Sequence, residues 1–166
     1  MMEDTSLHKA WVGLGTNLGD RMENMAIARQ HIGDRGGRIL AVSAMYESDP
    51  WGFESRNLFY NQCLVLDTHL SAESLLRVLQ KIESEMGRSQ SAGGYTDRII
   101  DLDLLFFDDL VMHTDELVLP HPKIQERMFV LKPLAEIAAK KIHPVLGVPV
   151  DELLERCAGN DIVKPV

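Results

Sequence analysis

The sequence predicts an α+β domain built on one antiparallel sheet, and three observations carry this prediction. Four segments have the apolar, β-prone character of strands, and two have the apolar spacing of amphipathic helices. They follow the order strand, helix, strand, strand, helix, strand, which is the ferredoxin-like split βαβ arrangement with both helices on one face. The 166 residues, 45% of them hydrophobic and 25% charged, suffice for a single domain, 1–166, with a substantial core.

Glycines and a capping residue delimit the first three elements. An apolar strand over 10–14 ends in the turn Gly13-Leu14-Gly15-Thr16-Asn17-Leu18-Gly19-Asp20, whose last residue can cap the helix that follows. That helix is expected over about 21–32, where glycines at 33, 36 and 37 stop it. Alternating polarity predicts the next strand over 38–46.

The remaining core elements are a strand, a helix and a strand. The strand is expected over 59–67, and the helix, over about 72–86, begins at Thr68 or Ser71 and carries an apolar stripe. The last core strand is 101–107, followed by a turn into 110–112. The C-terminal third is expected to add a helix over about 130–140 and an amphipathic segment at 151–156, and residues 1–8 to be a flexible tail.

Two aspartates in the last core strand carry the strongest functional signal. Asp101 and Asp103 stand two positions apart in a strand, so their side chains project from one face, about 6–7 Å apart at the backbone. Two like charges there repel each other and lose hydration unless a counter-charge is present. Oxygen-only ligands of this kind suit Mg²⁺, which completes its shell with waters and substrate phosphates. The pattern fits one or two divalent cations, or a strand end whose carboxylates meet solvent or basic neighbours.

The segment before this strand, 87–98, has the composition of a long loop. It is too rich in glycine for a helix interior and lacks the alternation of a strand, and Arg88 and Arg98 stand near its ends. Loops of about a dozen residues in compact domains are often lids. Because arginines and metal ions neutralise the charge that develops on phosphoryl oxygens, the loop and the paired aspartates together indicate polyphosphate transfer. The alternative is a solvated linker whose arginines have no such role.

Charge and cysteine content narrow the function classes. The net charge of −8 argues against a general binder of nucleic acid or anionic membranes, which needs a basic face. The two cysteines, Cys63 and Cys157, suggest neither a disulfide framework nor a zinc site. The chain has no apolar run of membrane-spanning length, no signal peptide and no P-loop. We therefore expect a cytoplasmic protein, monomeric or weakly self-associating, whose partners are small molecules.

With these pieces in order, the chain resembles the 6-hydroxymethyl-7,8-dihydropterin pyrophosphokinases of the folate pathway over about residues 9–148. The resemblance implies an enzyme that transfers the terminal two phosphates of ATP to the pterin hydroxymethyl group and releases AMP. Five motifs in the correct order carry it: Gly15-Thr16-Asn17-Leu18, Phe59-Tyr60-Asn61, Gly87-Arg88, Arg98 to Asp103, and Pro120-His121-Pro122 leading to Arg127-Met128-Phe129-Val130-Leu131.

On the nucleotide side, the resemblance implies that Asp101 and Asp103 bind two Mg²⁺ ions that bridge the triphosphate. Two ions can clamp both the attacking and the leaving oxygen of an in-line displacement. Asp103, nearest the reacting hydroxyl by analogy, could also receive its proton. Arg88 and Arg98 are implied to be catalytic through contact with the triphosphate. The further ATP contacts implied are Gln80, Glu83, Tyr95, His121 and Arg127.

On the pterin side, the resemblance implies that Asn61 hydrogen-bonds the ring, since an amide offers a donor and an acceptor together. Phe59 and Phe129 are implied to sandwich the flat ring. Without the resemblance the favoured interpretation of both is that they are core aromatics, and His121 could be a solvent-facing turn residue. The loop residues implied to approach the pterin are Ser48, Asp49 and Trp51.

The chain departs from the family pattern in the segment before Arg98. Tyr95 stands where many members have tryptophan, and Thr96-Asp97 replaces a Gly-Pro pair. Gln90 and Gly94 occupy positions that are basic in some relatives. An acidic residue near a polyphosphate is unexplained by the resemblance, so Asp97 is expected either to point away or to pair with Arg98.

Two other function classes remain open from the residues alone. One is a ferredoxin-like ligand-binding or regulatory module, although RNA binding would need exposed strand aromatics in basic surroundings. The other is a metal-dependent nucleotidyltransferase, which would also use paired aspartates and Mg²⁺. The nucleotidyltransferase would release pyrophosphate, whereas the favoured reaction releases AMP.

Overall fold

The computed structural model describes residues 6–51, 53, 55–87, 97–157 and 162–166. Its elements, in chain order, are β1 (His8–Thr16), α1 (Arg21–Arg35), β2 (Arg38–Val42), β3 (Tyr46–Ser48), β4 (Phe59–Thr68), α2 (Ala72–Glu85), β5 (Asp101–Phe107), β6 (Met112–His113), β7 (Val118–Leu119), a 3-10 turn (Ile124–Glu126), α3 (Met128–Ala138), α4 (Val150–Arg156) and β8 (Val163–Pro165). The main sheet has the order β5-β1-β4-β3-β8, and β2 pairs with β4 beside this path. Its pairings are antiparallel, so the predicted α+β class with an antiparallel sheet is confirmed.

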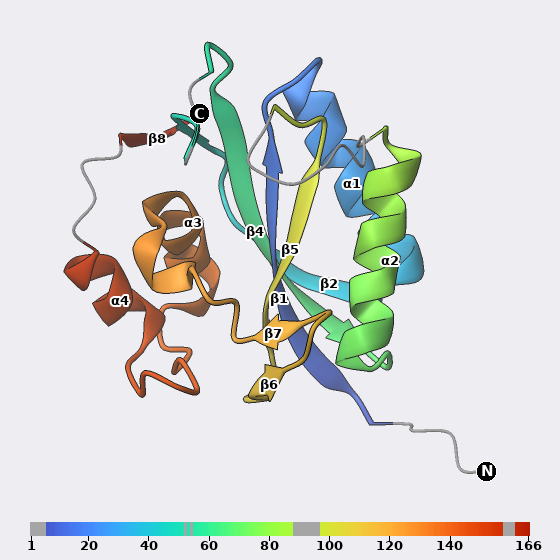
Figure 1. The fold of residues 1–166 in the computed structure, drawn as a ribbon, viewed down its shortest axis with the longest axis vertical. Coiled ribbons are helices and arrows are strands. Elements are labelled where there is room, and N and C mark those ends of the chain that lie inside the picture. Colours follow the sequence, from blue (N-terminus) through green and yellow to red (C-terminus); the bar gives the residue numbers. More distant parts are fainter. Residues whose placement is uncertain (1–5, 52, 54, 88–96, 158–161) are drawn as a thin grey trace.

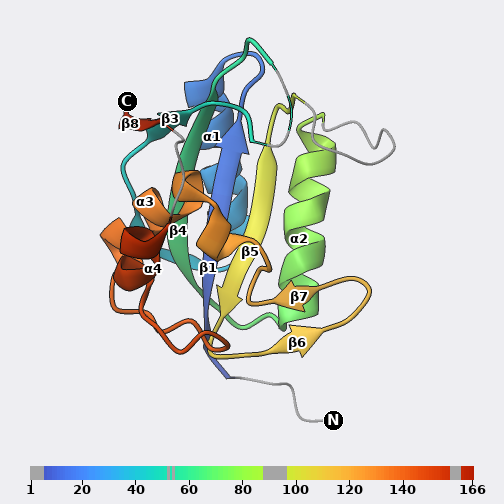
Figure 2. The ribbon, with the colours of Figure 1, turned by 60° about the vertical axis from the view of Figure 1, so that its left-hand side comes forward.

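The two faces of the main sheet carry separate apolar cores. Helices α1 and α2 cover one face, and α3 and α4 lie on the other (Figures 1 and 2). Residues of alternating parity on the central strands reach the two sides: Val12 and Leu64 belong to the core under α1 and α2, whereas Trp11 and Val65 belong to the core under α3 and α4. None of the helices in the described part of the chain is both long enough and apolar enough to cross a membrane.

A bulge in the β1–β5 pairing sets which side chains of β5 face which core. Trp11 pairs with Phe106 but Val12 pairs with Leu104, so Leu105 is the additional residue. As a result, two successive side chains, Leu105 and Phe106, both enter the core under α3 and α4. Before the bulge the alternation is regular, which leaves Asp101 and Asp103 on that same face.

One predicted strand is divided in two. The segment expected as a single strand over 38–46 forms β2 and β3, and Ser43 lies between them. The backbone N–H of Ser43 donates to the carbonyl of Cys63 (2.9 Å), but the N–H of Cys63 donates to the hydroxyl of Ser43 (3.0 Å) rather than to a backbone carbonyl. The hydroxyl replaces the ladder partner, and the chain can change direction there. Strand β8, which pairs with β3, has no counterpart in the sequence prediction.

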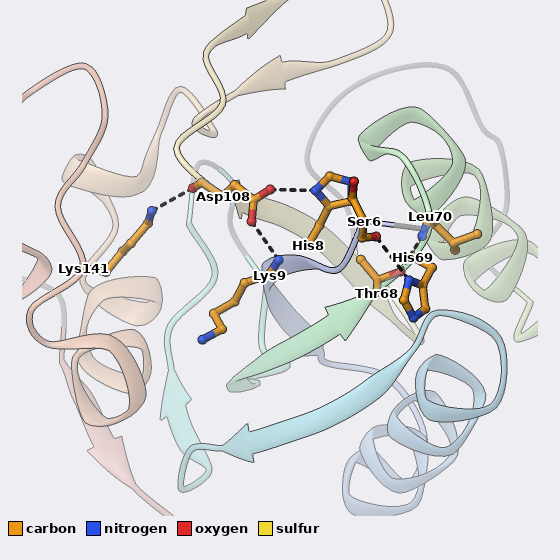
Figure 3. Close-up of polar contacts among 8 residues, drawn as sticks. All are labelled: Ser6, His8, Lys9, Thr68, His69, Leu70, Asp108 and Lys141. Atoms are coloured by element: carbon orange, nitrogen blue, oxygen red, sulfur yellow. Dashed lines mark hydrogen bonds and ion pairs between the residues drawn. The ribbon is translucent and has the colours of Figure 1, made fainter. Parts of the chain in front are cut away.

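Strand β1 starts earlier than expected, because the turn after β5 forms hydrogen bonds with its first residues. β1 begins at His8, inside the segment predicted to be a flexible tail, so that prediction was wrong for this residue. Asp108 accepts the backbone N–H of Lys9 (2.8 Å), and its other carboxylate oxygen lies 2.7 Å from Nδ1 of His8 (Figure 3). Lys141 donates to the backbone carbonyl of Asp108 (2.7 Å), which ties the segment after α3 to the same turn.

Candidate active site

A pocket opens on the face of the sheet that α3 covers. It is formed by four adjacent strands (β5, β1, β4 and β3), by the loop between β3 and β4, and by the start of α3. The residues that line it are Gly13, Leu14, Gly15, Ser48, Asp49, Trp51, Phe59, Asn61, Gln62, Cys63, Asp101, Asp103, Arg127, Phe129 and Val130. All six residues predicted to bind a pterin are among them, together with both predicted metal ligands and one predicted ATP contact.

Strand register explains why the pocket has room. Directly opposite residues of an antiparallel ladder present their side chains on the same face. Gly15 pairs with Asn61 on one side and with Asp101 on the other, so the middle of this row has no side chain. Gly13 stands in the same way between Cys63 and Asp103. The two glycines therefore form a flat floor between the polar residues of β4 and the carboxylates of β5.

Each aspartate of the pair is close to an arginine. Nη1 of Arg98 donates to a carboxylate oxygen of Asp101 (3.0 Å), and Nη1 of Arg127 lies 3.8 Å from a carboxylate oxygen of Asp103. The arginines thus supply the counter-charge that the repelling carboxylates require. This geometry agrees with the sequence alternative in which the carboxylates meet basic neighbours, and it also gathers the cations that a polyphosphate needs.

The paired carboxylates also fit the chemistry of a magnesium site. Both are only partly buried, so a cation would reach them without complete loss of water. Within the described residues no cluster of three or more His, Cys, Asp or Glu side chains could enclose a metal ion. A bound ion would therefore take one or two carboxylates from the protein and fill its shell with waters and substrate phosphates, which is the coordination that Mg²⁺ adopts in phosphate-binding sites.

Aromatic side chains form the walls of the pocket. The rings of Trp51 and Phe129 lie 6.5 Å apart at 58°, and the guanidinium carbon of Arg127 lies 4.7 Å from the Trp51 ring centroid. Phe59 packs edge-on against Phe53 at 6.2 Å. Phe59 and Phe129 are half-buried, not enclosed in the core, so each keeps ring surface available to a flat ligand.

Asn61 is buried and held in one orientation. Its Nδ2 donates to Oγ of Ser48 (2.7 Å) and approaches the carbonyl of Tyr46 (3.4 Å). With the amide nitrogen directed to β3, the amide oxygen lies above the floor, 3.8 Å from where a Cβ on Gly15 would stand. Ser48 therefore has a contact that the sequence did not suggest, because its hydroxyl orients the amide.

The remaining predicted ATP contacts lie outside this pocket. Glu83 is buried, and its carboxylate accepts the backbone N–H of Leu102 on β5 (2.8 Å), so it joins α2 to the strand of the aspartates. Gln80 is exposed on α2. Arg88 and Tyr95 lie outside the described residues, as does most of the predicted lid.

His121 lies beside β5, where its backbone N–H donates to the carbonyl of Leu105 (2.9 Å). Burial, with Arg127 and Lys123 adding to it, lowers the pKa of His121 to about 4, although Asp101 acts in the opposite direction. Its Nδ1 accepts the backbone N–H of Lys123 (3.1 Å). The ring is therefore neutral at pH 7 and can only donate from Nε2 to a ligand.

The sequence prediction missed the glycine floor and the place of the buried Cys63 in the pocket lining. Gly13 and Gly15 were interpreted as turn residues, and only the register with β4 and β5 shows that they leave space. The spacing was a signal that could have found them: Gly13 and Gly15, like Asp101 and Asp103, are two residues apart on a strand, so each pair lies on one face. Burial, followed by the charges of Asp103 and Glu136, raises the pKa of the Cys63 thiol, so this side chain is a neutral wall and not a nucleophile.

Comparison with known proteins gives a consistent result. The family model described as 7,8-dihydro-6-hydroxymethylpterin-pyrophosphokinase matches residues 11–139. A 2-amino-4-hydroxy-6-hydroxymethyldihydropteridine pyrophosphokinase of Porphyromonas gingivalis is 39% identical over 142 residues, which cover 84% of this chain and 96% of that protein. The Bacillus subtilis protein of the same name is 39% identical over 147 residues, with 86% of each chain covered.

Some relatives are much longer than this chain. The folic acid synthesis protein fol1 of Pneumocystis carinii is 38% identical over 156 residues, which are 94% of this chain but only 21% of that protein. Among solved structures, Plasmodium falciparum HPPK-DHPS A437G with SDX-DHP has a TM-score of 0.76 and 18% identity, and the match covers 93% of this chain and 46% of that one. At this identity the likeness concerns the fold alone.

Proposed function

The chain belongs to the 7,8-dihydro-6-hydroxymethylpterin-pyrophosphokinase family, and on this premise we propose that it transfers pyrophosphate from ATP to the hydroxymethyl group of 6-hydroxymethyl-7,8-dihydropterin. The products are AMP and the pterin diphosphate, an intermediate of tetrahydrofolate synthesis. The strand order β5-β1-β4-β2 supports a ferredoxin-like core for the enzyme. We propose that residues 1–166 act as one cytoplasmic domain and as a monomer.

The observation that carries this proposal is the row Asn61–Gly15–Asp101. It crosses three adjacent strands, so Asn61 and Asp101 stand about 10 Å apart at the backbone, twice the spacing of neighbouring strands. A hydrogen-bonding amide at one end and paired carboxylates at the other match the two ends of an acceptor whose ring must be recognised and whose hydroxyl must react. The empty centre of the row accommodates the ring between them.

The acceptor side follows from the walls of the pocket. The pterin ring stacks between Phe59 and Phe129, and Asn61 hydrogen-bonds its edge. Asp49 and Trp51 close the pocket from the loop between β3 and β4. This placement directs the hydroxymethyl group along the floor towards the carboxylates, so that the hydroxyl and the triphosphate meet above β5.

The chemical step is an in-line displacement at the β-phosphorus of ATP. The pterin hydroxyl oxygen forms a bond to this phosphorus, and the bond to the oxygen that bridges the α- and β-phosphorus breaks, so AMP leaves. The hydroxyl proton passes to a carboxylate of the pair. Arg98 and Arg127 neutralise the phosphoryl oxygens, and Arg88, Tyr95, Gln80, Glu83 and His121 remain predicted nucleotide contacts.

Asp101 and Asp103 are the residues that would hold the magnesium ions. Two Mg²⁺ ions, when bound, would neutralise the polyphosphate and hold its oxygens in place. The two arginines that now face the aspartates are then available for the phosphates, because the cations take over the neutralisation of the carboxylates.

Incubation of the purified protein with ATP, Mg²⁺ and the reduced hydroxymethylpterin tests this proposal. We expect AMP and the pterin diphosphate in equal amounts, and no product when a chelator removes Mg²⁺. Release of pyrophosphate with a nucleotide-bearing product would instead establish a nucleotidyltransferase. Binding of either ligand without turnover would establish a binding module.

A further inference from the structure

Three loops meet at the end of the sheet where β1 ends and where β4 and β5 begin (Figure 2). They are the turn between β1 and α1, the loop between β3 and β4, and the residues just before β5. Asn17, Asn57 and Asp97 supply one side chain from each, and we call this trio the Asp97 clasp. None of the three lines the active-site pocket, and none has a role in the reaction proposed above.

Asn17 forms two hydrogen bonds with the backbone of Arg98, as a neighbouring strand residue would. Its backbone N–H donates to the carbonyl of Arg98 (2.9 Å), and its side-chain Oδ1 accepts the backbone N–H of Arg98 (2.6 Å). Both backbone polar groups of Arg98 are thus bound by one residue, and Asn17 is itself 2% exposed. Because Oδ1 must accept from Arg98, the orientation of the amide is fixed and Nδ2 points to Asp97.

Asp97 connects that turn to the loop of the acceptor pocket. One carboxylate oxygen accepts Nδ2 of Asn17 (2.8 Å), and the other accepts Nδ2 of Asn57 (3.1 Å). The backbone carbonyl of Asn57 also accepts from Nδ2 of Asn17 (3.2 Å), which closes the triangle. The acidic residue that the family pattern did not explain is therefore a two-sided acceptor between two amide donors.

The clasp lies between the two halves of the proposed site. Arg98 follows Asp97 directly, and its guanidinium contacts Asp101. Asn57 precedes Phe59 by two residues and lies in the same loop as Asp49 and Trp51. A single carboxylate therefore fixes the backbone that carries the phosphate-side arginine relative to the loop that holds the acceptor.

We propose that Asp97 is a positioning residue for this reaction: through Asn17 and Asn57 it sets the position of Arg98 relative to the acceptor loop. The inference rests on the proposed function for its kinetic consequence, but the hydrogen-bond geometry is independent of it. Asp97 touches no substrate in this scheme and acts only through Arg98 and the loop.

Donor and acceptor chemistry gives the proposal a sharp test. In Asp97→Asn, one of the two amide donors must face an NH₂ group, so one hydrogen bond is lost with almost no change in shape. In Asn57→Asp, two carboxylates face each other. In the double variant Asp97→Asn/Asn57→Asp, the new amide accepts from Asn17 and donates to the new carboxylate, which restores both bonds and the net charge.

The measurements are kcat for AMP formation per folded enzyme, the melting temperature, and hydrogen exchange of the Arg98 amide. We expect each single variant to lower kcat about tenfold, as for the loss of one charge-assisted hydrogen bond, and to accelerate exchange at Arg98. The double variant should return kcat to within about threefold of the wild type. If Asp97→Asn does not fold, Asn57→Ala replaces it in these measurements, because it removes one of the two donors at an exposed loop residue. Asp151→Asn, which removes an ion pair with Lys140 far from the site, should leave kcat unchanged.

A single variant that melts earlier but keeps the wild-type kcat would reduce the clasp to a structural contact and overturn the proposal. A loss that the double variant does not repair would do the same. If the wild-type protein forms no AMP, the proposed function fails instead. In that case, unchanged Arg98 exchange in the single variants would still refute the clasp, and faster exchange that the double variant reverses would support its positioning role.

Discussion

The two faces of the main sheet differ in the side chains that they present, although the same strands form both. On the face under α1 and α2, strands β1, β4 and β5 contribute Val12, Leu64 and Leu104, which are fully or almost fully buried. On the other face, at the end near the pocket, the same strands contribute glycines, Asn61 and the two aspartates. The first face buries apolar surface there, whereas the second gives up this burial at its pocket end, although the rest of that face packs under α3 and α4.

The difference shows how a small domain can contain a pocket that contributes little to its folding stability. Burial of apolar surface stabilises by about 25 cal/mol per Å², and the positions of Gly13 and Gly15 contribute almost none of it. Repelling carboxylates add a further cost in the absence of ligand. The core under α1 and α2 and the core under α3 and α4 must supply the stability that the site lacks. Changes on the pocket face should therefore alter function far more than folding.

The strongest test of this contrast is removal of a carboxylate. Asp101→Ala or Asp103→Ala should reduce turnover roughly a thousandfold, since the proposed cation site would lose half of its protein ligands. The free energy of unfolding should change by less than about 1 kcal/mol, because the partly exposed pair with an arginine contributes little and the repulsion disappears. Kinetics and urea denaturation give the two values. Asp115→Asn, on an exposed turn, is the control, and near-normal turnover of Asp103→Ala would refute the assignment.

Removal of the Asn61 amide, the proposed pterin contact, should have the next largest effect. Asn61→Ala should weaken pterin binding by about 1–3 kcal/mol and leave ATP binding nearly unchanged. Ser48→Ala should act in the same direction but less, because it removes only the acceptor that orients the amide. Calorimetry with each ligand distinguishes the two sides. Equal losses for ATP and pterin would mean that the sheet itself is disturbed.

A methyl group on the floor should harm binding without harming the fold. In Gly15→Ala the new Cβ would meet Phe59 at 3.6 Å and Asn61 at 3.8 Å, which are ordinary contacts. The free energy of unfolding should change by less than about 1 kcal/mol, since glycine in a strand is itself unfavourable. KM for the pterin should rise about tenfold as the methyl group occupies ring space. Gly33→Ala, which meets Ile39 at a similar 3.6 Å inside α1, is the matched control; an unchanged KM in Gly15→Ala would remove the floor from the site.

The smallest expected effect concerns acid stability. The folded protein holds the pKa of His121 at about 4, below the value of about 6.5 expected in the unfolded chain. The unfolded state therefore binds a proton first, so stability falls as the pH decreases from about 6.5 to about 4. His121→Asn keeps an acceptor for Lys123 and should move the acid midpoint of unfolding down by about half a pH unit or less. His69→Asn, in the turn that follows β4, is the control and should not move it.

The face under α1 and α2 could be predicted from the sequence, and much of the pocket face could not. Apolar periodicity gave both core helices and the strand of the aspartates, because these depend on local spacing. The break at Ser43 and the early start at His8 depend on hydrogen bonds to Cys63 and Asp108, residues distant in the sequence. Such contacts leave no periodic signal.

Within the candidate site the same division holds. The two-residue spacing of Asp101 and Asp103 is enough to predict that both side chains lie on one face of their strand. Asn61, Phe59 and Phe129 came only from the resemblance, since nothing local separates a ring-binding aromatic from a core aromatic. The roles of Gly15 and Asp97 required the register of three strands and the meeting of three loops.

The hydrogen bonds of Glu83 and His121 also cover part of the free edge of β5. β5 lies at the border of the main sheet, where exposed N–H and C=O groups would otherwise accept a strand from another molecule. The Glu83 carboxylate covers the N–H of Leu102, and the backbone N–H of His121 covers the carbonyl of Leu105. The strand of the paired aspartates can thus lie at the margin of the sheet, with one face open to the pocket, while part of its edge is already bonded and does not offer a template for another strand.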